Sequence, residues 1–283
     1  MILIADGGST KVDWIVLNRN KEELYRIKSS GLNPAILLKE ELIFTINNIP
    51  QLINIKNQVD EIYFYGAGCG SPQPATLLNN LLQTVFSNAK ITVSEDMLAA
   101  VYACSPKEPA IVAILGTGSN SCYYNGNTIQ KTFPSLGYAI MDEASGNYFG
   151  KKLLRDFYYE KMPTHLSTLF KSEFNLNIDV VKSNLYVNPS PNMYLAAFAK
   201  FMFNHKNEKY IQKLIQKGFQ KYFKFQILPY QKDNETPIYF IGSIAYYFKD
   251  ILEKIAIKNN LIITDVVQRP IDKLVEFHQK NTF

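Results

Sequence analysis

The sequence predicts an α/β protein with two domains of similar construction. Short apolar strands alternate with helical segments, and a strand followed by a glycine-containing turn occurs twice. We call these turns the first glycine hinge, Ala5–Trp14 (ADGGSTKVDW), and the second glycine hinge, Ile114–Ser121 (ILGTGSNS). A further strand and a turn follow the second hinge, so we expect a duplicated β-meander. With 283 residues, 47% of them hydrophobic, the chain can bury two cores.

The first domain is expected to span residues 1–106. Apolar patterning predicts strands at Ile2–Ala5, Val12–Leu17, Leu24–Lys28, Glu61–Tyr65 and Ile91–Val93. Helical periodicity predicts helices at Leu37–Asn47, Ala75–Phe86 and Met97–Ala103. The third helix is entered through Ser94, Glu95 and Asp96, residue types that favour a helix N-terminus.

The second domain is expected to span residues 107–283 and to follow a hinge near Ser105–Glu108. Strands are predicted at Ala110–Leu115, Ser121–Tyr124, Thr128–Thr132, Ile238–Ile241 and Ile262–Val267, with a turn at Asn125–Asn127. Helices are predicted at Ser145–Glu160, Pro191–Asn204, Glu208–Phe225, Gly242–Ile257 and from Pro270 onward. The last of these helices can pack back on the first domain.

Composition excludes several classes of protein. The net charge of +5 comes from scattered lysines without a basic arm, so no nucleic-acid partner is expected. No apolar run reaches membrane-spanning length and no basic leader precedes one, so we expect a cytoplasmic protein without a membrane partner. Cys69, Cys104 and Cys122 lack the spacing of a disulfide framework or a zinc site. The absence of a GxxxxGK[ST] sequence excludes a P-loop.

The two glycine hinges have the chemistry of phosphate-binding turns. Glycine allows the backbone to approach a ligand closely, and each hinge adds hydroxyl groups and N–H donors. Asp6 lies on the first hinge, and the second has no matching carboxylate, which suggests that only the first also contacts a metal ion. The alternative for each hinge is an ordinary turn between two strands.

Six short motifs give the chain a resemblance to a known family. DGGSTK, YGAG, SED, GTGSNS, DEASG and FIGSIA occur in the order found in the actin/Hsp70/hexokinase superfamily. Within that superfamily, the chain resembles the N-acetylglucosamine kinase and BadF/BadG/BcrA/BcrD-type ATPase family over nearly its whole length. The resemblance implies two ribonuclease-H-like domains, the actin-like ATPase fold, flanking a nucleotide and sugar cleft.

The resemblance also implies nucleotide-binding and catalytic residues. ATP phosphates would contact Gly7, Gly8, Ser9, Thr10 and Lys11 of the first hinge and Thr117 and Gly118 of the second, while Asp6 would hold Mg²⁺ through water. Gly242, in FIGSIA, would lie against the adenosine. Asp96 matches the family's catalytic aspartate, which takes the proton of the sugar hydroxyl. The alternative for Asp96 is a helix-capping residue.

The implied sugar-binding residues are Asn33, Ser119, Asn120, Ser135 and Asp142. Most of them have a structural alternative: an Asn-Pro turn for Asn33, a polar strand start for Ser119 and Asn120, and a helix N-cap for Asp142–Ser145. Three positions depart from the family pattern, since Ser135, Met141 and Ala144 stand where the family has glycine. These departures predict a narrower acceptor pocket or one shaped for a different sugar.

The sequence therefore predicts a kinase that uses ATP and Mg²⁺ to phosphorylate an amino sugar, either N-acetylglucosamine or a relative such as N-acetylmuramic acid. Two alternatives stay open. A BadF-type ATPase activator would need two cluster-binding cysteines per chain, and no such pair is evident. A non-catalytic sugar or nucleotide sensor would fit the altered DEASG motif, although Asp96 is retained. The expected partner is a small-molecule sugar, and a homodimer stays open.

Overall fold

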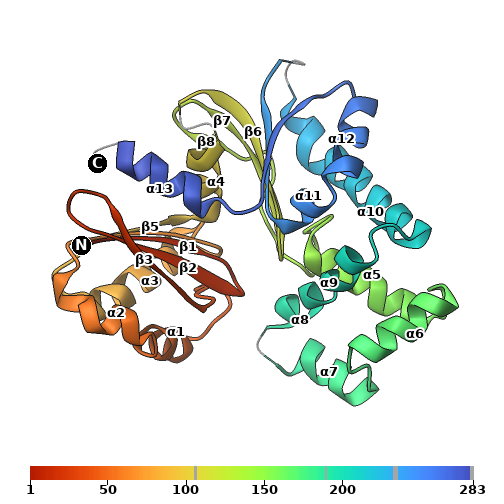
Figure 1. Cartoon of the computed structure of the whole chain (residues 1–283), viewed down its shortest axis with the longest axis horizontal. Coiled ribbons are helices and arrows are strands. Elements are labelled where there is room, and N and C mark those ends of the chain that lie inside the picture. Colours follow the sequence, from red (N-terminus) through yellow and green to blue (C-terminus); the bar gives the residue numbers. More distant parts are fainter. Residues whose placement is uncertain (105–106, 189, 232–234, 281–283) are drawn as a thin grey trace. The chain divides into compact units, whose positions relative to one another are not determined.

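The computed structural model describes residues 1–104, 107–188, 190–231 and 235–280. The chain divides into two compact units, Met1–Pro106 together with Pro270–Phe283, and Lys107–Arg269. Part of the hinge expected at 105–108 lies outside the described residues. Each unit is built around its own five-stranded mixed sheet (Figure 1).

The first sheet has the strand order β3-β2-β1-β4-β5. Its strands are β1 (Ile2–Gly7), β2 (Lys11–Leu17), β3 (Glu23–Ser30), β4 (Glu61–Gly66) and β5 (Lys90–Glu95). The first three strands form an antiparallel meander, whereas β4 runs parallel to β1 and β5 parallel to β4. All five predicted strands are present, most of them one or two residues longer than expected.

Helices cover both faces of the first sheet. One face packs against α1 (Lys39–Asn47), α2 (Pro50–Ile55) and α3 (Pro72–Val85) around the buried rings of Trp14 and Phe64. The other face packs against α4 (Asp96–Cys104) and α13 (Ile271–Lys280), so the C-terminal helix belongs to this unit (Figure 1). The α2 helix and the 3₁₀ turn at Lys56–Gln58 were not predicted, because the run is short and begins at a proline.

The second sheet repeats the topology of the first. Its order is β10-β9-β6-β7-β8, with β6 (Pro109–Leu115), β7 (Ser119–Asn125), β8 (Ile129–Gln130), β9 (Ile238–Ile241) and β10 (Ile263–Val267). The first three of these strands form an antiparallel meander, while β9 and β10 are parallel to β6 and β9 respectively. The predicted duplication of the meander and the α/β fold class are confirmed.

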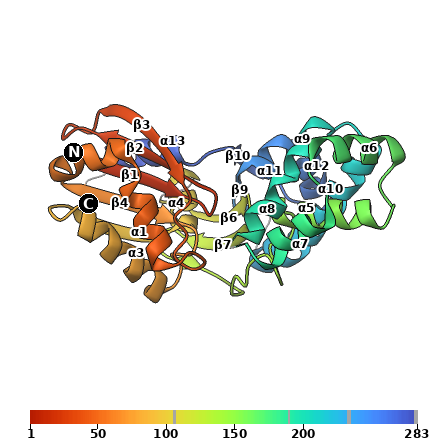
Figure 2. The same ribbon diagram turned by 90° about the horizontal axis from the view of Figure 1, so that it is seen from below.

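The second unit carries more helices than the first (Figure 2). They are α5 (Gly146–Tyr158), α6 (Thr164–Glu173), α7 (Ile178–Tyr186), α8 (Pro191–Ala197), α9 (Ala199–Asn204), α10 (Lys209–Tyr222), α11 (Ser243–Tyr247) and α12 (Lys249–Lys258). Two predicted long helices are each divided, at Phe198 and at Phe248, and α6 and α7 were missed. A π-helical turn, Phe223–Ile227, and a 3₁₀ turn, Leu228–Tyr230, continue from α10.

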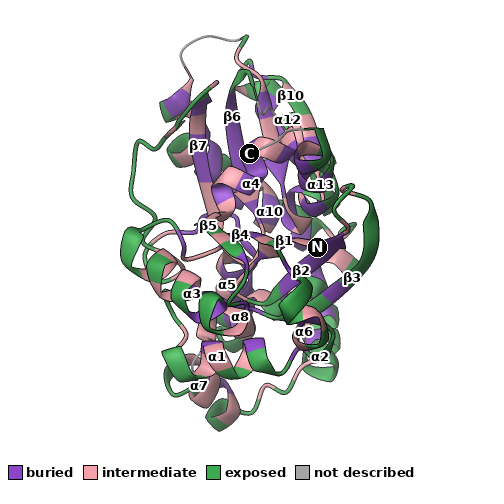
Figure 3. Ribbon diagram, turned by 90° about the vertical axis from the view of Figure 1, so that its left-hand side faces the viewer, coloured by how far each residue is buried: buried purple, intermediate pink, exposed green. Residues whose placement is uncertain are grey.

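The cores follow from this arrangement. The central strands β1, β2, β4, β6 and β9 are largely buried, while the edge strand β3 is mostly exposed and α1 and α3 expose their outer faces (Figure 3). Among the cysteines, Cys69 and Cys122 are buried and Cys104 is partly exposed. Within the described part of the chain, no helix is long and apolar enough to cross a membrane.

Candidate functional site

The first glycine hinge and Asp96 lie at the same edge of the first sheet. The parallel strands β1, β4 and β5 end in register, with Gly7 opposite Gly66 and Gly66 opposite Glu95. Asp96, the next residue, is the first of α4. Because ligands of α/β sheets bind beyond the carboxyl ends of the parallel strands, this edge is the candidate site of the first unit.

The backbone of the first hinge is partly committed to its own turn. The Gly8 N–H donates to the Lys11 carbonyl at 2.8 Å, so this amide closes the hairpin instead of facing a phosphate as expected. A Cβ on Gly7 would lie 2.5 Å from the Phe64 ring, so packing requires glycine there. At the tip of the hinge, Ser9 is partly exposed and Thr10 is exposed. Their hydroxyl groups lie where the motif predicts donors to a phosphate.

Asn33 is buried, at 7% exposure, and connects its loop to the first hinge. Its Oδ1 accepts the Ala35 N–H at 3.0 Å, and its Nδ2 donates to the Ser9 hydroxyl at 2.7 Å. The first bond is the Asn-Pro turn that was the alternative for this residue. The second brings Asn33 beside the phosphate hinge, so both features are present at once.

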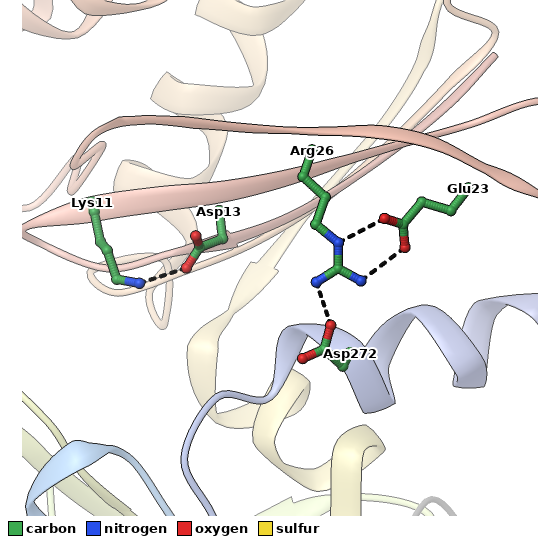
Figure 4. A network of polar contacts seen from close by, with 5 residues as sticks. All are labelled: Lys11, Asp13, Glu23, Arg26 and Asp272. Atoms are coloured by element: carbon green, nitrogen blue, oxygen red, sulfur yellow. Dashed lines mark hydrogen bonds and ion pairs between the residues drawn. The ribbon is translucent and has the colours of Figure 1, made fainter.

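Lys11 forms an ion pair that the sequence analysis missed. Its Nζ lies 2.6 Å from Oδ2 of Asp13, which is only 7% exposed (Figure 4). Asp13 pairs across the sheet with Asp6, so two carboxylates stand on neighbouring strands with the Lys11 ammonium beside one of them. The i, i+2 spacing of Lys11 and Asp13 in a strand is the signal that could have shown this pair.

A second ion-pair group in the same unit fastens the C-terminal helix. The Arg26 guanidinium binds Glu23 in β3 and Asp272 in α13 (Figure 4). His278 of α13 is 4% exposed and lies 2.9 Å from the Tyr65 hydroxyl. Burial, followed by the nearby Lys21 charge, lowers the pKa of His278 from 6.5 to about 4. This histidine is therefore neutral at pH 7 and serves packing.

The charge of Asp96 acts on the thiol of Cys69. Burial raises the pKa of Cys69 to about 12, and the negative charge of Asp96 adds to this effect. A thiol that stays protonated at neutral pH is a poor nucleophile. Cys69 therefore stays a neutral thiol at neutral pH, and Asp96 provides the carboxylate at this edge of the sheet.

The corresponding edge of the second sheet joins the second glycine hinge to Gly242. Ile114 of β6 pairs with Ile241 of β9, which pairs with Val267 of β10. Gly242 follows directly with φ of 113°, and a Cβ there would lie 2.7 Å from the Leu115 carbonyl carbon and 3.2 Å from the Gly116 nitrogen. The two sequence motifs GTGSNS and FIGSIA therefore meet in the fold.

The DEASG loop, Asp142–Gly146, is bonded directly to the second hinge. Gly146 and Asn147 donate their N–H groups to the carbonyls of Gly116 and Thr117, at 2.8 and 3.0 Å. The Ser119 hydroxyl donates to the Glu143 carbonyl at 2.8 Å. The structure thus brings Thr117 and Gly118, predicted to hold phosphate, close to Ser119 and Asp142, predicted to hold sugar.

Asp142 is the buried acid of this loop, at 8% exposure. Asn147 donates to its Oδ2 at 2.9 Å, and a Cβ on Gly118 would lie 2.8 Å from the same oxygen. Burial raises the pKa of Asp142, and the Asn147 hydrogen bond opposes this rise. Ser145, not Asp142, caps α5, because its hydroxyl accepts the Tyr148 N–H. The role of Asn147 was missed, since a lone asparagine in a first helical turn is an ordinary sequence feature.

The remaining predicted sugar residues are placed less directly. Ser119 and Asn120 begin β7, as their structural alternative held, and Asn120 Oδ1 accepts the Ser121 N–H at 2.9 Å. Ser135 is exposed in the loop that precedes Asp142. Glu143, which the sequence analysis did not assign, is paired with Lys221 at 2.9 Å. Only a fold could reveal that pair, because its members lie far apart in the chain.

A solved structure supplies the family. A Porphyromonas gingivalis protein described as a candidate N-acetylglucosamine kinase superposes with a TM-score of 0.91 and 33% identity, covering 99% of each chain. The chain belongs to the N-acetylglucosamine kinase family. A second candidate N-acetylglucosamine kinase, from Chromobacterium violaceum, shares the fold with a TM-score of 0.72 and 13% identity over 98% of both chains.

More distant structures extend the comparison to the sugar-kinase fold. A ROK-family glucokinase from Streptomyces griseus, solved with glucose and AMPPNP, has a TM-score of 0.58 and 12% identity over 97% of both chains. No family model and no curated protein matched the sequence. The two mixed sheets of this chain are therefore those of the actin-like ATPase sugar kinases.

The donor groups of the candidate site have the chemistry that a nucleotide and Mg²⁺ would need. Asp6 is partly exposed, and among the described residues no three acidic, histidine or cysteine side chains gather into a metal-binding group. A single carboxylate suits Mg²⁺, which keeps most of its water ligands. Gly116 leaves open space where a Cβ would stand, so a ligand can approach the second hinge closely.

Proposed function

We propose that this chain is an ATP-dependent kinase that phosphorylates a hydroxyl group of an amino sugar, with N-acetylglucosamine or a close relative as the acceptor. The observation that carries the proposal is the bonding of the second glycine hinge to the DEASG loop, which joins a phosphate-type turn to a buried, polar acceptor-type loop. Membership of the N-acetylglucosamine kinase family supports the same activity.

Asp96 has the role of general base in this proposal. It follows β5 at the carboxyl edge of the first sheet, where α4 begins, and it is partly exposed. Its carboxylate takes the proton of the sugar hydroxyl while the sugar oxygen bonds to the γ-phosphorus and the bond to the ADP oxygen breaks. Mg²⁺ would neutralise charge on the phosphates beside Asp6.

The hinges position the phosphates. Ser9, Thr10 and Lys11 of the first hinge and Thr117 and Gly118 of the second offer hydroxyl, ammonium and amide donors. Asp13 holds the Lys11 ammonium near the carboxyl edge that also carries Asp6. Gly242 is required by the backbone beside Leu115, so its contribution to nucleotide binding is to shape the second hinge.

The acceptor sugar is assigned to Asp142 with Asn33, Ser119, Asn120 and Ser135 as further candidates. Asp142 is the strongest of these, because it is buried and Asn147 holds one of its carboxylate oxygens by a hydrogen bond. Buried hydrogen-bonding groups discriminate strongly between sugars, since a wrong ligand leaves them unpaired. A sugar with hydroxyl and acetamido groups fits such a lining.

An ADP-release assay over a panel of hexoses and hexosamines tests the proposal. We expect ADP release that depends on an N-acetylated amino sugar, and sugar-independent turnover alone would contradict it. Asp96→Asn should lower kcat by about 10²- to 10⁴-fold, the usual contribution of a general base, while ATP binding stays within about twofold. The neighbouring carboxylate provides the matched control, so Glu95→Gln should keep most of the activity.

A further inference from the structure

The end of α10 contacts both parts of the candidate site in the second unit. We define the α10 clasp as Lys221, Tyr222, Gln226 and Tyr230. Lys221 pairs with Glu143 of the DEASG loop, and the Tyr222 hydroxyl donates to the Asn120 carbonyl at 2.7 Å. The clasp therefore connects one helix end to the hinge and to the loop.

The π-helical turn completes this set of contacts. The Ser121 hydroxyl donates to Gln226 Oε1 at 2.7 Å, and the Tyr230 hydroxyl donates to the Ser121 carbonyl at 3.1 Å. Thus Asn120 and Ser121, two consecutive residues of β7, are bonded to three members of the clasp. A π-helical turn is a rare feature that is found frequently at functional sites.

Burial makes the Tyr222 contact the central one. Tyr222 has 0% exposure, whereas Asn120 is partly exposed, so the donor of this bond is buried and its acceptor only partly so. Removing the Tyr222 hydroxyl takes away a donor that the fold holds in place, and water can replace it only in part. Lys221 is instead half-exposed, with 48% of its side chain accessible, and its ammonium also lies 5.8 Å from the centre of the Tyr148 ring.

We propose that Tyr222 is a positioning residue that fixes the second glycine hinge through the Asn120 carbonyl, and that Lys221 fixes the DEASG loop through Glu143. The proposal rests on the proposed sugar kinase function for its kinetic consequence. Its structural consequence is independent of any activity: removing the Tyr222 hydroxyl loosens residues 116–121 without unfolding the unit.

Tyr210 offers a matched control on the same helix. Its hydroxyl donates to Asp156 Oδ2 at 2.9 Å, so Tyr210→Phe and Tyr222→Phe each remove one hydroxyl from α10. Tyr222→Phe breaks the bond to the Asn120 carbonyl and also removes the contact with the Ser121 side chain. Asp156 lies near the C-terminal end of α5, away from the hinge and from the DEASG loop. Tyr210 is partly exposed, so this control matches the loss of a hydroxyl group and not the burial of Tyr222.

Hydrogen exchange of the ligand-free chain is the first measurement. Tyr222→Phe should speed exchange of amides in 116–121 by about five- to tenfold, the factor expected for one lost hydrogen bond, and Tyr210→Phe should leave it unchanged. Equal exchange in both variants would overturn the proposal, whether or not the chain is a kinase.

Kinetics is the second measurement. Tyr222→Phe should raise KM for the acceptor sugar about five- to tenfold and change KM for ATP less, because Asn120 is a proposed sugar residue. Lys221→Met keeps the aliphatic stem at a half-exposed position and should also raise the sugar KM. Unchanged sugar KM values in both variants of an active enzyme would refute the positioning role, whereas failure of the wild type on every sugar would refute the kinase function instead.

Discussion

Replacing Gly242 by alanine tests whether this glycine is required by the backbone. Gly242 has φ of 113° and ψ of 163°, a region that is essentially restricted to glycine. An added methyl group would lie 2.7 Å from the Leu115 carbonyl carbon and 3.2 Å from the Gly116 nitrogen, and both are backbone atoms that a rotamer change cannot move. Alanine therefore forces β6 and β9 apart at the edge where they end.

The magnitude follows from two terms. The backbone conformation costs a side chain about 1–3 kcal/mol, and the steric overlap adds about 1–3 kcal/mol. A loss near 4 kcal/mol should lower the unfolding midpoint of a unit of this size by about 8–16 °C. Gly116→Ala is the matched control, because a Cβ on Gly116 meets nothing within 4 Å.

Thermal and urea unfolding of both variants provide the assay. We expect Gly242→Ala to be strongly destabilised and Gly116→Ala to stay within about 0.5 kcal/mol of the wild type. If Gly242→Ala kept the wild-type unfolding free energy but lost affinity for ATP, the backbone argument would be wrong. In that case Gly242 would be needed for contact with the nucleotide itself.

Three further predictions use other parts of the structure. Burial lowers the pKa of His278 from 6.5 to about 4 in the folded chain. The contribution of this residue to the free energy of unfolding is therefore fully present above pH 6.5, and it is lost, by up to about 3 kcal/mol, as the pH falls toward 4. Urea titrations at several pH values should show a smaller fall for His278→Gln. Gly118→Ala should displace the Asp142 carboxylate, because the added Cβ would lie 2.8 Å from Oδ2. We expect the KM for the sugar to rise in the ADP-release assay, with only a small loss of unfolding free energy. Ala144→Gly should change the unfolding free energy by less than about 1 kcal/mol, because relief of its positive φ offsets a buried methyl group. Ala245→Gly, in helix α11, should instead cost about 2 kcal/mol in the same assay.

The sheets were predictable because their signals are local. Strand β9 was located to the residue at Ile238–Ile241, and both meanders followed from apolar strands separated by short turns. Helix α4 also began where the acidic residues before Met97 indicated. In each case the decisive residues lie within a few positions of one another.

The helical part of the second unit was less predictable for a physical reason. Helices α6 and α7 lie in a polar part of the chain, and each buries only one or two residues. The predicted helix Gly242–Ile257 is divided at Phe248, whose backbone leaves the helical conformation with φ of −119° and ψ of 28°. Tertiary packing decides such features, and periodicity does not reveal them.

The candidate site divides in the same way. Motif residues such as Asp96, Gly118 and Asp142 could be named from the sequence, because the motifs that contain them resemble those of a known family in kind and order. Their supporting contacts could not be named, since Asn147, Lys221 and the Lys11–Asp13 pair are defined by side-chain directions in the fold. Sequence therefore identifies candidates for chemistry more readily than the residues that hold them.

The DEASG loop holds an alanine in a backbone conformation that favours glycine. Ala144, at a position where the resemblance implies glycine, has a positive φ of 58°, and Asp142 has one of 67°. Its methyl group has 0% exposure and packs in the core of the second unit, so it cannot narrow a pocket by facing a ligand. Ser135 is exposed and Met141 is partly exposed, so these are the departures whose side chains reach the surface. An altered sugar preference therefore points to Ser135 and Met141, while the consequence of Ala144 is backbone strain.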